Sequence, residues 1–409
     1  MLNSYYIEKL IGFQGVQVKN IEEKEEKQIF SIELERKEVK CPCCGKMTSK
    51  EHDYRTQIIK DLPAFGKTID ISYRKRRYVC ECGKRFAEPN DFLARYQRMT
   101  NRAITELLDR LSNVHSYTSV GKEFGVSPNT VIRFFENVQY PKPTKLPEVI
   151  GIDEFKGNSG GEKFNGILTD IAQKRVIDIL KTRKSGDLYT YFRNYDRSGV
   201  KYFVSDMYAP YRELAETFFP NATYVIDKYH WIRQATWAFE NVRKEVQKKF
   251  SKKHRIYFKH SRSLLLKRMD KLEPEQVTQV MIMLDCSAEL STAYFLKEQL
   301  YKILDMTDPV KQRAQFSDWI EEAEESEVKA FQKCAKTYRN WFEPITNSFF
   351  CPYTNGFTEG CNNKIKVLKR NAFGMQDFKR FRNRILFVFQ KATLHGFFTL
   401  FYVFTFLCC

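Results

Sequence analysis

The chain has 409 residues, of which 43% are hydrophobic and 15% aromatic, so it is too long for one ordinary domain and has enough apolar side chains for several cores. Lysine and arginine number 68 against 50 aspartates and glutamates, and the net charge of +18 predicts a polyanionic partner, with nucleic acid ahead of a membrane or an acidic protein. The first residues lack the pattern of a secretory signal, and the eleven unevenly spaced cysteines argue against a disulfide-stabilised secreted protein and for metal binding in a reducing cytoplasm.

Residues 1–40 are strongly charged, and their second half alternates in the manner of a strand, so we expect an N-terminal leader. Residues 41–95 contain the cysteine motifs CPCC and CEC, separated by two extended runs that join at a turn with Pro63 and Gly66. A hairpin of this kind brings the two motifs together, and four thiolates around one point suit Zn²⁺. The predicted ligands of this zinc-binding ribbon are Cys41, Cys44, Cys80 and Cys82.

Two alternatives to this ligand set stay open on the sequence alone. In the first, the four cysteines are buried without a metal, although a glycine after each pair favours the tight turns of a ligand site. In the second, Cys43 replaces one ligand, because Cys80 and Cys82 are closer in sequence than the usual CxxC pair. Four thiolates leave no open coordination position, which indicates a structural role for the zinc.

A cluster of cations lies directly before the second cysteine motif, in the run YRKRRY at 73–78. One interpretation is a solvated strand face, and the one that we favour is a strand edge that contacts DNA phosphates. The predicted phosphate contacts are Arg74, Lys75, Arg76 and Arg77.

Residues 96–140 are predicted to form a helix-turn-helix DNA-binding domain, and the proline-rich segment 140–147 reads as a linker after it. One helix ends near Gly125, and Ser127 is placed to cap a second helix whose first residue is Pro128. The expected apolar joint consists of Val120, Phe124, Val126, Val131 and Phe135. The outward residues of the second helix, at positions that a recognition helix uses on base edges and phosphates, are Asn129, Thr130 and Arg133. Helical hairpins in general give similar patterns, and the cysteines and the positive charge favour DNA binding here.

After the linker the pattern changes to α/β, with five strand-like runs and two helix-like runs before residue 230. The predicted strands are 148–153, 164–171, 175–181, VKYFVSD and ATYVID, and the predicted helices are 186–195 and YAPYRELAETFF. Residues 231–340 are helix-patterned without a convincing strand, and residues 355–395 form a basic helical block. The apolar run 396–409 is shorter than the roughly 18 residues needed to cross a bilayer, so we expect no membrane span there.

Three acidic residues lie where strands or helices of this region begin or end. Asp153 ends one strand, Asp206 follows another strand directly before a helix, and Glu359 lies near the start of a helix. Carboxylates that meet from such positions bind two hard divalent cations, which activate a water or a 3′ hydroxyl for attack on a phosphodiester. Each acid taken singly is more often a surface residue, so the prediction depends on their order and context. The following cations would hold the substrate backbone: Lys364, Lys366, Lys369 and Arg370.

Other polar residues of this region are ranked below these three. Asp170 and Asp178 lie in strand-like runs that precede no helix, and we expect them to be structural. Glu154 points away from Asp153 if the strand alternates. Asp227 and His230 also follow a strand, and they either line the site or anchor the next helix.

The motifs CPCCG, YVCECGKRF, GIDEF, VSDMYAPY, VIDKYHW and TEGCNNKIKVLKR, with the helix-turn-helix between the second and third, resemble bacterial insertion-sequence transposases of the ISL3 type over about residues 41–395. The resemblance implies a multidomain α/β protein in which a zinc ribbon and a helix-turn-helix precede a ribonuclease-H-like, mixed-sheet catalytic core. The core would comprise 147–230 and 341–395 around an α-helical insertion at 231–340. It implies a DDE triad at Asp153, Asp206 and Glu359, and N-terminal modules that bind the terminal inverted repeats.

The expected function is therefore a DNA transposase of the bacterial cytoplasm and nucleoid that depends on Mg²⁺ or Mn²⁺, carries structural Zn²⁺ and assembles as a homo-oligomer on the two element ends and on target DNA. The alternative is a catalytically inactive zinc and helix-turn-helix regulator derived from a transposase. A structure-specific nuclease that never joins strands is a further rival. Membrane attachment through the short apolar tail is the weakest alternative, because of the length of the tail.

Overall fold

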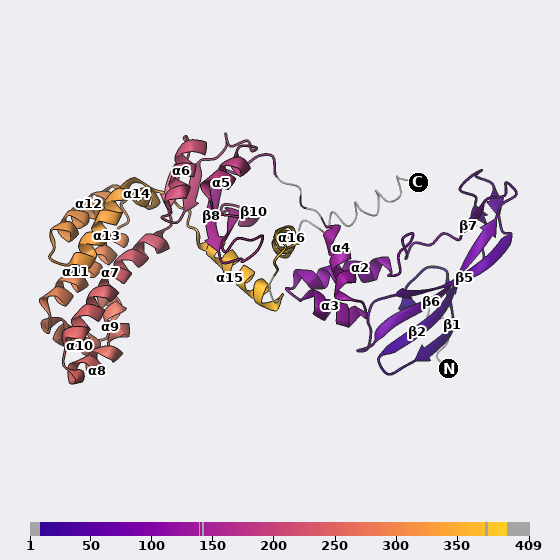
Figure 1. The fold of residues 1–409 in the computed structure, drawn as a ribbon, viewed down its shortest axis with the longest axis horizontal. Helices are drawn as coiled ribbons and strands as arrows, with labels where there is room; N and C mark the ends of the chain where they lie inside the picture. The colour runs from indigo at the N-terminus through magenta and orange to yellow at the C-terminus, as the bar shows by residue number, and fades with distance from the viewer. Residues whose placement is uncertain (1–8, 139, 141–142, 373–374, 391–409) are drawn as a thin grey trace. The chain divides into compact units, whose positions relative to one another are not determined.

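The computed structural model describes residues 9–138, 140, 143–372 and 375–390, so the apolar run at 396–409 lies outside the described residues. The chain divides into two compact units, whose elements are labelled in Figure 1. The first unit comprises Met1–Tyr140, Lys366–Met375 and Lys379–Cys409, and the second comprises Pro141–Ile365 and Gln376–Phe378. Among the described helices, none combines the length and the apolar character that a membrane crossing requires.

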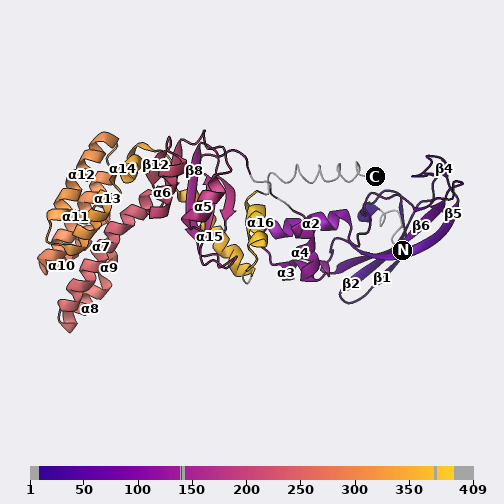
Figure 2. The ribbon, with the colours of Figure 1, turned by 45° about the horizontal axis from the view of Figure 1, so that its top comes forward.

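The first unit contains a five-stranded sheet in the order β1-β2-β6-β5, with β7 also paired to β6. Figure 2 labels β1, β2, β5 and β6 of this sheet. Its strands are β1 (Val16–Glu23), β2 (Lys27–Leu34), β5 (Glu51–Lys60), β6 (Thr68–Val79) and β7 (Arg85–Ala87). The predicted hairpin around Pro63 and Gly66 is present as the antiparallel pair β5–β6, whereas β2 pairs with β6 in parallel. Ile32, Ile59 and Tyr73 are buried in its core. The first 40 residues, which the sequence sets apart as a leader, thus supply two strands to the sheet that carries the second cysteine motif.

Three helices follow the sheet, and they agree with the predicted helix-turn-helix. They are α2 (Asn101–Ser112), α3 (Tyr117–Phe124) and α4 (Pro128–Glu136). Ser127 caps α4 by accepting a hydrogen bond from the backbone N–H of Thr130, and Pro128 is its first residue. Val120 and Val131 are fully buried between the helices. The local signals for cap and helix start were sufficient here because both act within one turn.

The last described helix, α16 (Phe378–Phe389), packs against this three-helix domain. The rings of Phe387 and Phe135 meet edge to face at 5.4 Å. Arg384 is buried and donates to the backbone oxygen of His115 at 2.6 Å, and burial lowers the pKa of its guanidinium to about 10. The sequence groups 341–395 with the catalytic core, whereas in the structure α16 from Lys379 onward belongs to the first unit, where Phe387 joins the apolar core of the helix-turn-helix.

The second unit is built on a mixed sheet in the order β10-β9-β8-β11-β12. The strands are β8 (Val149–Phe155), β9 (Asn165–Asp170), β10 (Arg175–Leu180), β11 (Tyr202–Ser205) and β12 (Thr223–Ile226). The first three form an antiparallel meander, and β11 and β12 then continue the sheet in parallel to β8. The helices α5 (Ser185–Phe192) and α6 (Ala209–Phe218) lie in the two connections that parallel pairing requires. The central strands β8 and β9 are almost wholly buried, as expected for a sheet that is covered on both faces.

A helical insertion follows β12, and no strand occurs among its described residues. It consists of α7 (Lys228–Lys249), α8 (Lys252–His260), α9 (Arg262–Leu266), the 3-10 helix η1 (Met269–Lys271), α10 (Pro274–Asp285), α11 (Ala288–Leu304), α12 (Pro309–Glu325) and α13 (Lys329–Asn340). In Figure 1, α7, α11, α12 and α13 run alongside one another. Trp231, Phe316 and Tyr338 fill the centre of this bundle, where the Tyr338 hydroxyl donates to the backbone oxygen of Trp231 at 2.5 Å.

Two helices then return the chain to the sheet. The helix α14 (Phe342–Phe350) packs on β12, where Asn347 donates to the backbone oxygen of Tyr224 at 2.8 Å. The helix α15 (Gly356–Asn371) begins beside the sheet, where the hydroxyls of Thr358 and Thr169 lie 2.8 Å apart in a buried contact. The insertion therefore starts at β12 and ends at the helix that carries Glu359.

Candidate functional site

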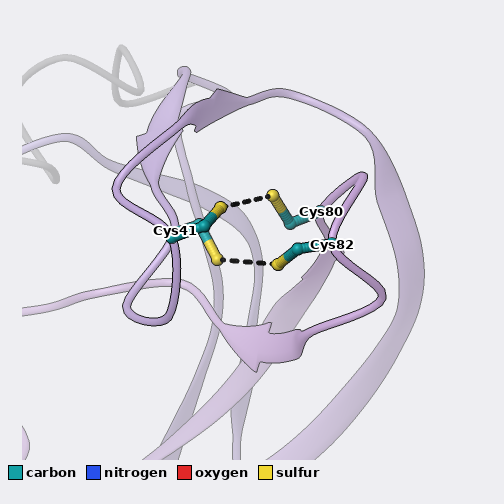
Figure 3. A group of neighbouring side chains, drawn as sticks. Cys41, Cys80 and Cys82 are labelled. Atoms are coloured by element: carbon teal, nitrogen blue, oxygen red, sulfur yellow. Dashed lines mark hydrogen bonds between the residues drawn. The ribbon is translucent and has the colours of Figure 1, made fainter.

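Four cysteine thiols converge in the first unit. Cys41 and Cys44 lie in the loop between the short strands β3 (Val39–Lys40) and β4 (Met47–Thr48), while Cys80 and Cys82 lie in the turn between β6 and β7. The sulfur of Cys41 is 3.7 Å from that of Cys82, and the sulfur of Cys44 is 3.5 Å from that of Cys80 (Figure 3). All four sulfurs lie within 4.8 Å of one another. Four sulfurs at about 2.3 Å from a tetrahedral zinc are about 3.8 Å apart, so the thiols fit this ion.

The two cysteine turns have the same local geometry. The N–H of Gly45 donates to the backbone oxygen of Cys41, and the N–H of Gly83 donates to that of Cys80. Both glycines have a positive φ, of 75° and 82°, which a residue with a side chain adopts only at a cost. The glycines after the two cysteine motifs therefore allow each turn to fold its thiols toward the common centre.

Cys43 takes a different position from the four clustered cysteines. Its side chain is exposed, and its backbone N–H donates to the sulfur of Cys41 at 3.4 Å. Burial opposes ionisation of Cys41, but hydrogen bonds from the backbone of Cys44 and Cys43, together with the neighbouring thiols, lower the pKa of Cys41 to about 6. The thiolate is the form that binds zinc. Cys43 thus supports a ligand through its backbone, and the short Cys80–Cys82 spacing still brings both sulfurs to the cluster.

The cations of the run at 73–78 are engaged with carboxylates of the sheet. Arg76 is 5% exposed and forms ion pairs with Glu51 and Glu88 at 3.2 and 3.3 Å, so its side chain is a structural one. Arg77 pairs with Asp53 at 2.8 Å, and Arg74 pairs with Glu33 at 2.6 Å. Burial lowers the pKa of the Lys75 amine. Arg76 is therefore not suited to contact a DNA phosphate, because its guanidinium is buried and has two acidic partners.

The second helix of the helix-turn-helix presents the predicted polar residues to the outside. Asn129 and Arg133 are exposed and Thr130 is half-buried, whereas Val131 and Phe135 of the same helix are buried. Gly121 of the preceding helix allows a close approach, because a Cβ there would lie 2.7 Å from the backbone oxygen of Val126. The packing thus leaves one face of α4 available to a ligand.

In the second unit, three aspartates lie at the same edge of the sheet. Asp153 is near the end of β8, Asp206 directly follows β11, and Asp227 directly follows β12. These strands are neighbours and mutually parallel, so their carboxyl ends meet at one edge. Ligand sites in open α/β sheets form at this edge.

The start of α15 is attached to this edge by hydrogen bonds to two of the aspartates. The side-chain amide of Asn362 donates to Oδ2 of Asp153 at 2.8 Å, in a buried contact. The backbone N–H of Asn355 donates to Oδ1 of Asp227 at 2.9 Å. Because Glu359 lies between these two asparagines in the first turn of α15, the same contacts hold it beside the aspartates.

Burial and mutual repulsion strongly perturb two of the carboxyls. Burial, followed by the charges of Glu154, Glu359 and Asp227, raises the pKa of Asp153 to about 7, against a hydrogen bond from the Glu154 backbone. Burial and the charges of Asp153 and Glu154 raise the pKa of Asp206 to about 7. Oδ1 of Asp206 and Oδ1 of Asn362 are buried without a hydrogen-bond partner. Repelling carboxylates with an unpartnered oxygen fit a divalent cation, which binds through oxygen and removes the repulsion.

Asp227, His230 and Glu359 form the tightest set at this edge. Their ligand atoms all lie within 4.8 Å of one another, and Nε2 of His230 is 3.7 Å from Oε1 of Glu359. Among the residues that the structure describes, Asp153, Asp206 and Glu359 do not come this close as a set. Asp227 also caps α7 by accepting from the N–H of Tyr229 at 3.3 Å, so it both anchors the helix and lines the site. Burial lowers the pKa of His230, which keeps the imidazole neutral and able to bind a metal.

Comparison with known protein families shows to which family the chain belongs. The family model for the transposase of the ISL3 DDE type matches residues 150–385, which is more than half of the chain. The chain belongs to the ISL3 family of transposases. Models for the zinc finger of transposases IS204/IS1001/IS1096/IS1165 and for the helix-turn-helix domain of transposase family ISL3 match residues 37–82 and 88–138.

Two curated proteins are similar to this transposase. The transposase for insertion sequence element IS1001 of Bordetella parapertussis is 27% identical over 396 residues, which cover 93% of this chain and 97% of that protein. A protein of Lactococcus lactis subsp. lactis that is named an ATP-dependent protease is 40% identical over 58 residues, which cover 14% of this chain and 19% of that protein. The first similarity spans the zinc, helix-turn-helix and catalytic regions alike, whereas the second covers too little of either chain to carry an argument.

The remaining acids of the transposase sheet have separate partners. Glu154 forms an ion pair with Arg183, whose guanidinium lies over the ring of Tyr208 at 4.9 Å. Asp170 accepts from the N–H of Gln173 and from Arg175, and Asp178 accepts from the hydroxyl of Tyr191 at 2.8 Å. The last two carboxylates fix a turn and a helix, as predicted. Glu154 pairs with Arg183, but its negative charge still raises the pKa values of Asp153 and Asp206.

The cations of α15 lie on more than one face of the helix. Lys364, Lys366 and Arg370 are exposed, and Lys369 is half-buried. By helical periodicity, Lys366 and Arg370 lie on the face of Glu359, because they follow it by 7 and 11 residues, and Lys364 does not.

Sequence reasoning missed several residues that shape this site. Asn362 had a usable signal, because it follows Glu359 by three residues and shares its side of the helix. Arg183 lies in a loop with no motif, and its pairing with Glu154 depends on the folded sheet. Tyr211 is fully buried, and burial together with the charges of Asp206, Glu154 and Asp153 raises the pKa of its hydroxyl well above its usual value. Tyr211 is therefore a buried neighbour of these carboxylates.

Proposed function

We propose that this transposase binds the terminal inverted repeats of an insertion sequence and carries out metal-dependent strand cleavage and strand transfer at the aspartate edge of the second unit. The observation that carries the proposal is the pair Asp153 and Asp206 at the ends of adjacent parallel strands, where Asp153 is buried, Asp206 is half-buried and both pKa values are raised to about 7. Such perturbed carboxyls concentrate at functional sites. Their position at the carboxyl edge of the sheet supports a catalytic role.

The sheet topology supports a ribonuclease-H-like core. Three antiparallel strands, two parallel strands and an acidic residue at the end of the central strand are the arrangement that the family resemblance leads one to expect. We assign 147–230 and the start of α15 to this core, 231–340 to the helical insertion, and 96–140 to the helix-turn-helix. The zinc-binding part, assigned to 41–95 from the sequence, is extended to include β1 and β2 because these strands share its sheet. By the same reasoning, α16 belongs with the helix-turn-helix.

We assign the triad Asp153, Asp206 and Glu359 as the residues that hold divalent cations, with Mg²⁺ or Mn²⁺ as the ion. A bound pair of such ions activates the attacking oxygen and stabilises the leaving oxygen in phosphodiester cleavage. Asn362 orients Asp153 through its 2.8 Å hydrogen bond, and Asn355 orients Asp227 through its backbone N–H. Asp227 and His230 would add ligands beside Glu359, because the ligand atoms of these three residues lie within 4.8 Å of one another.

The first unit would provide recognition. The zinc ion would be structural, because the four thiols fill its coordination, and it would fix the end of the sheet. Asn129, Thr130 and Arg133 of α4 would read the terminal repeat. The cations Arg74, Lys75 and Arg77, which precede the second cysteine motif, would contact DNA phosphates. Since two ends must be paired before transfer, we expect a homo-oligomer on DNA, acting on the nucleoid in the bacterial cytoplasm.

The test is a cleavage assay on a labelled duplex that carries the element end, in Mg²⁺, with the full-length chain. Asp153→Asn, Asp206→Asn and Glu359→Gln are expected to bind the end as the native chain does and to yield no cut product. The matched control is Glu148→Gln, which removes an exposed carboxylate at the start of the same strand region. A native chain that binds ends but never cuts them would instead be the regulator, and equal cutting of unrelated DNA without joining would indicate a nuclease.

A further inference from the structure

The helix α7 exposes an aromatic and cationic stripe along one face, formed by Tyr229, Arg233 and Trp237. Tyr229 and Trp237 are 54% and 46% exposed, although both are large hydrophobic residues. The guanidinium of Arg233 lies 4.2 Å from the ring centre of Trp237 and 5.7 Å from that of Tyr229. Residues four apart share a helix face, so Tyr229, Arg233 and Trp237 lie on one side of α7. The next residue on that side, Glu240, is buried and pairs with Arg243 and Arg262 at 2.6 and 2.9 Å, so the stripe ends at Trp237.

The core of the insertion does not account for this stripe. The apolar residues that α7 buries are on its other side and include Trp231, Ala235 and Phe239. The stripe carries the cation Arg233 and no carboxylate, so its charge suits an anionic ligand. An acidic protein or an anionic membrane would also suit this charge. The exposed rings favour a partner with planar groups that can stack on them, as nucleic-acid bases do.

The stripe begins at the proposed catalytic edge. Asp227 caps α7, and the ring of Tyr229 contacts the ring of His230 at 5.7 Å, edge to face. His230 lies in turn 3.7 Å from Glu359. A DNA strand whose phosphate reaches the aspartates therefore has neighbouring nucleotides within reach of Tyr229 and, about two helical turns further, of Trp237.

We propose that the α7 stripe binds unpaired nucleotides of the DNA strand beside the phosphate that is cut. Bases of an intact duplex are already stacked, whereas an unpaired base offers a free face to a tyrosine, a tryptophan or an arginine. Arg233 is held between the two rings, so it can neutralise the backbone phosphate that accompanies such a base. The inference rests on the proposed function, because the cut phosphate is placed by the aspartate edge.

The test compares two DNA probes bound by the full-length chain in EDTA, so that no cutting occurs. One probe is a fully paired duplex of the element end, and the other has three mismatched base pairs at the cut position with 2-aminopurine among them. The native chain is expected to bind the mismatched probe about 10-fold or more tightly than the paired one and to quench the 2-aminopurine by stacking. Trp237→Ala and Tyr229→Ala should each remove much of that preference and of the quenching, while the affinity for the paired probe stays the same.

Three further variants make the test specific. Trp237→Phe keeps a ring and should restore most of the quenching, and Arg233→Ala should weaken the preference. Phe295→Ala is the matched control, because Phe295 is an aromatic residue of α11 that is 44% exposed and lies outside the stripe. Equal binding of the two probes by the native chain would overturn the proposal, as would unchanged preference and quenching in Trp237→Ala. A change of oligomeric state in Trp237→Ala with unchanged preference would overturn it in favour of a protein interface.

Failure of the stripe is distinguishable from failure of the proposed function. Asp206→Asn should keep the preference for the mismatched probe, because Asp206 is not part of the stripe. If the native chain showed the Trp237-dependent preference but no cutting in Mg²⁺, the catalytic proposal would fail and the stripe would stand. If cutting required Asp206 but Trp237→Ala bound both probes as the native chain does, the stripe proposal would be wrong and the catalytic proposal would stand.

Discussion

The side-chain amide of Asn362 donates to Oδ2 of Asp153 at 2.8 Å, in a buried hydrogen bond between residues 209 positions apart. It joins the helix that carries Glu359 to the central strand of the sheet. The other oxygen, Oδ1, accepts from the backbone N–H of Glu154 at 2.7 Å, so both oxygens of Asp153 are held in place. Residues that orient a metal-binding carboxylate in this way are often worth 10- to 100-fold in activity.

We therefore expect Asn362→Ala to reduce the rate of end cleavage by roughly 10- to 100-fold without abolishing it. The affinity for end DNA should stay the same, because Asn362 is buried and the proposed recognition residues belong to the helix-turn-helix. Single-turnover cleavage and a binding titration measure the two quantities. A cleavage rate equal to that of the native chain would mean that Asp153 needs no such support.

The raised pKa values of Asp153 and Asp206 predict a pH-dependent stability in EDTA. Folding raises both pKa values from 3.8 to about 7, so it favours the protonated forms. The resulting stabilisation is full below about pH 4 and is lost as the pH rises through about 7. Asp206→Asn should accordingly unfold with a free energy about 1–3 kcal/mol higher than the native chain at pH 8, and the difference should shrink toward pH 4. Denaturant titrations at several pH values measure it, with the exposed Asp187→Asn as the control.

The same carboxyls predict how cation binding depends on pH. A cation must displace the protons that the raised pKa values retain, so its affinity should rise between pH 6 and 8 and level off above. Mn²⁺ binding by calorimetry in two buffers of different ionisation enthalpy detects the released protons. An affinity that does not change over this range would contradict a site that includes both aspartates.

The zinc site predicts a difference between neighbouring cysteines. Cys44→Ser removes a sulfur that lies 3.5 Å from Cys80, so the zinc content should fall from about one per chain toward zero. The melting temperature should fall by roughly 10 °C, since bound zinc stabilises the fold. Cys43→Ser leaves the four clustered sulfurs and the backbone N–H in place and should keep both quantities. Equal zinc loss in both variants would show that Cys43 is a ligand.

The exposed face of α4 predicts separate effects on binding and folding. Asn129→Ala and Arg133→Ala should each weaken end binding by about 5- to 100-fold with little change in stability, because both residues are exposed. Gly121→Ala should destabilise the domain instead, since its Cβ would meet the Val126 oxygen at 2.7 Å. Fluorescence anisotropy and thermal melts separate the two effects, with the exposed Thr105→Ala as the control. Normal end binding by both α4 variants would exclude α4 as the recognition helix.

Sequence reasoning succeeded where the physical cause is local. Ser127 and Pro128 mark the start of α4 within one turn, and the strand-to-helix positions of Asp206 and Asp227 follow from patterns of a few residues. The zinc ligands also follow from short motifs, because each turn is closed by its own glycine.

It failed where a distant partner decides the outcome. Arg76 has the sequence context of an exposed cation, but in the folded chain it is buried and pairs with Glu51 and Glu88. The strand β2 lies in a segment that reads as a charged leader, and its parallel pairing with β6 cannot be seen from either segment alone. Likewise, the aromatic face of α16 does not reveal that Phe135 is the ring it will contact.

The central claim, that Asp206 holds a catalytic cation together with Asp153 and Glu359, is tested most directly by a change of ligand chemistry. Asp206→Cys replaces the carboxylate with a thiolate, which Mg²⁺ binds poorly and Mn²⁺ tolerates better. The variant should bind end DNA normally, cut it at least about 10³-fold more slowly than the native chain in Mg²⁺, and recover a substantial part of the rate in Mn²⁺. Undiminished cleavage by Asp206→Cys in Mg²⁺ would contradict the claim.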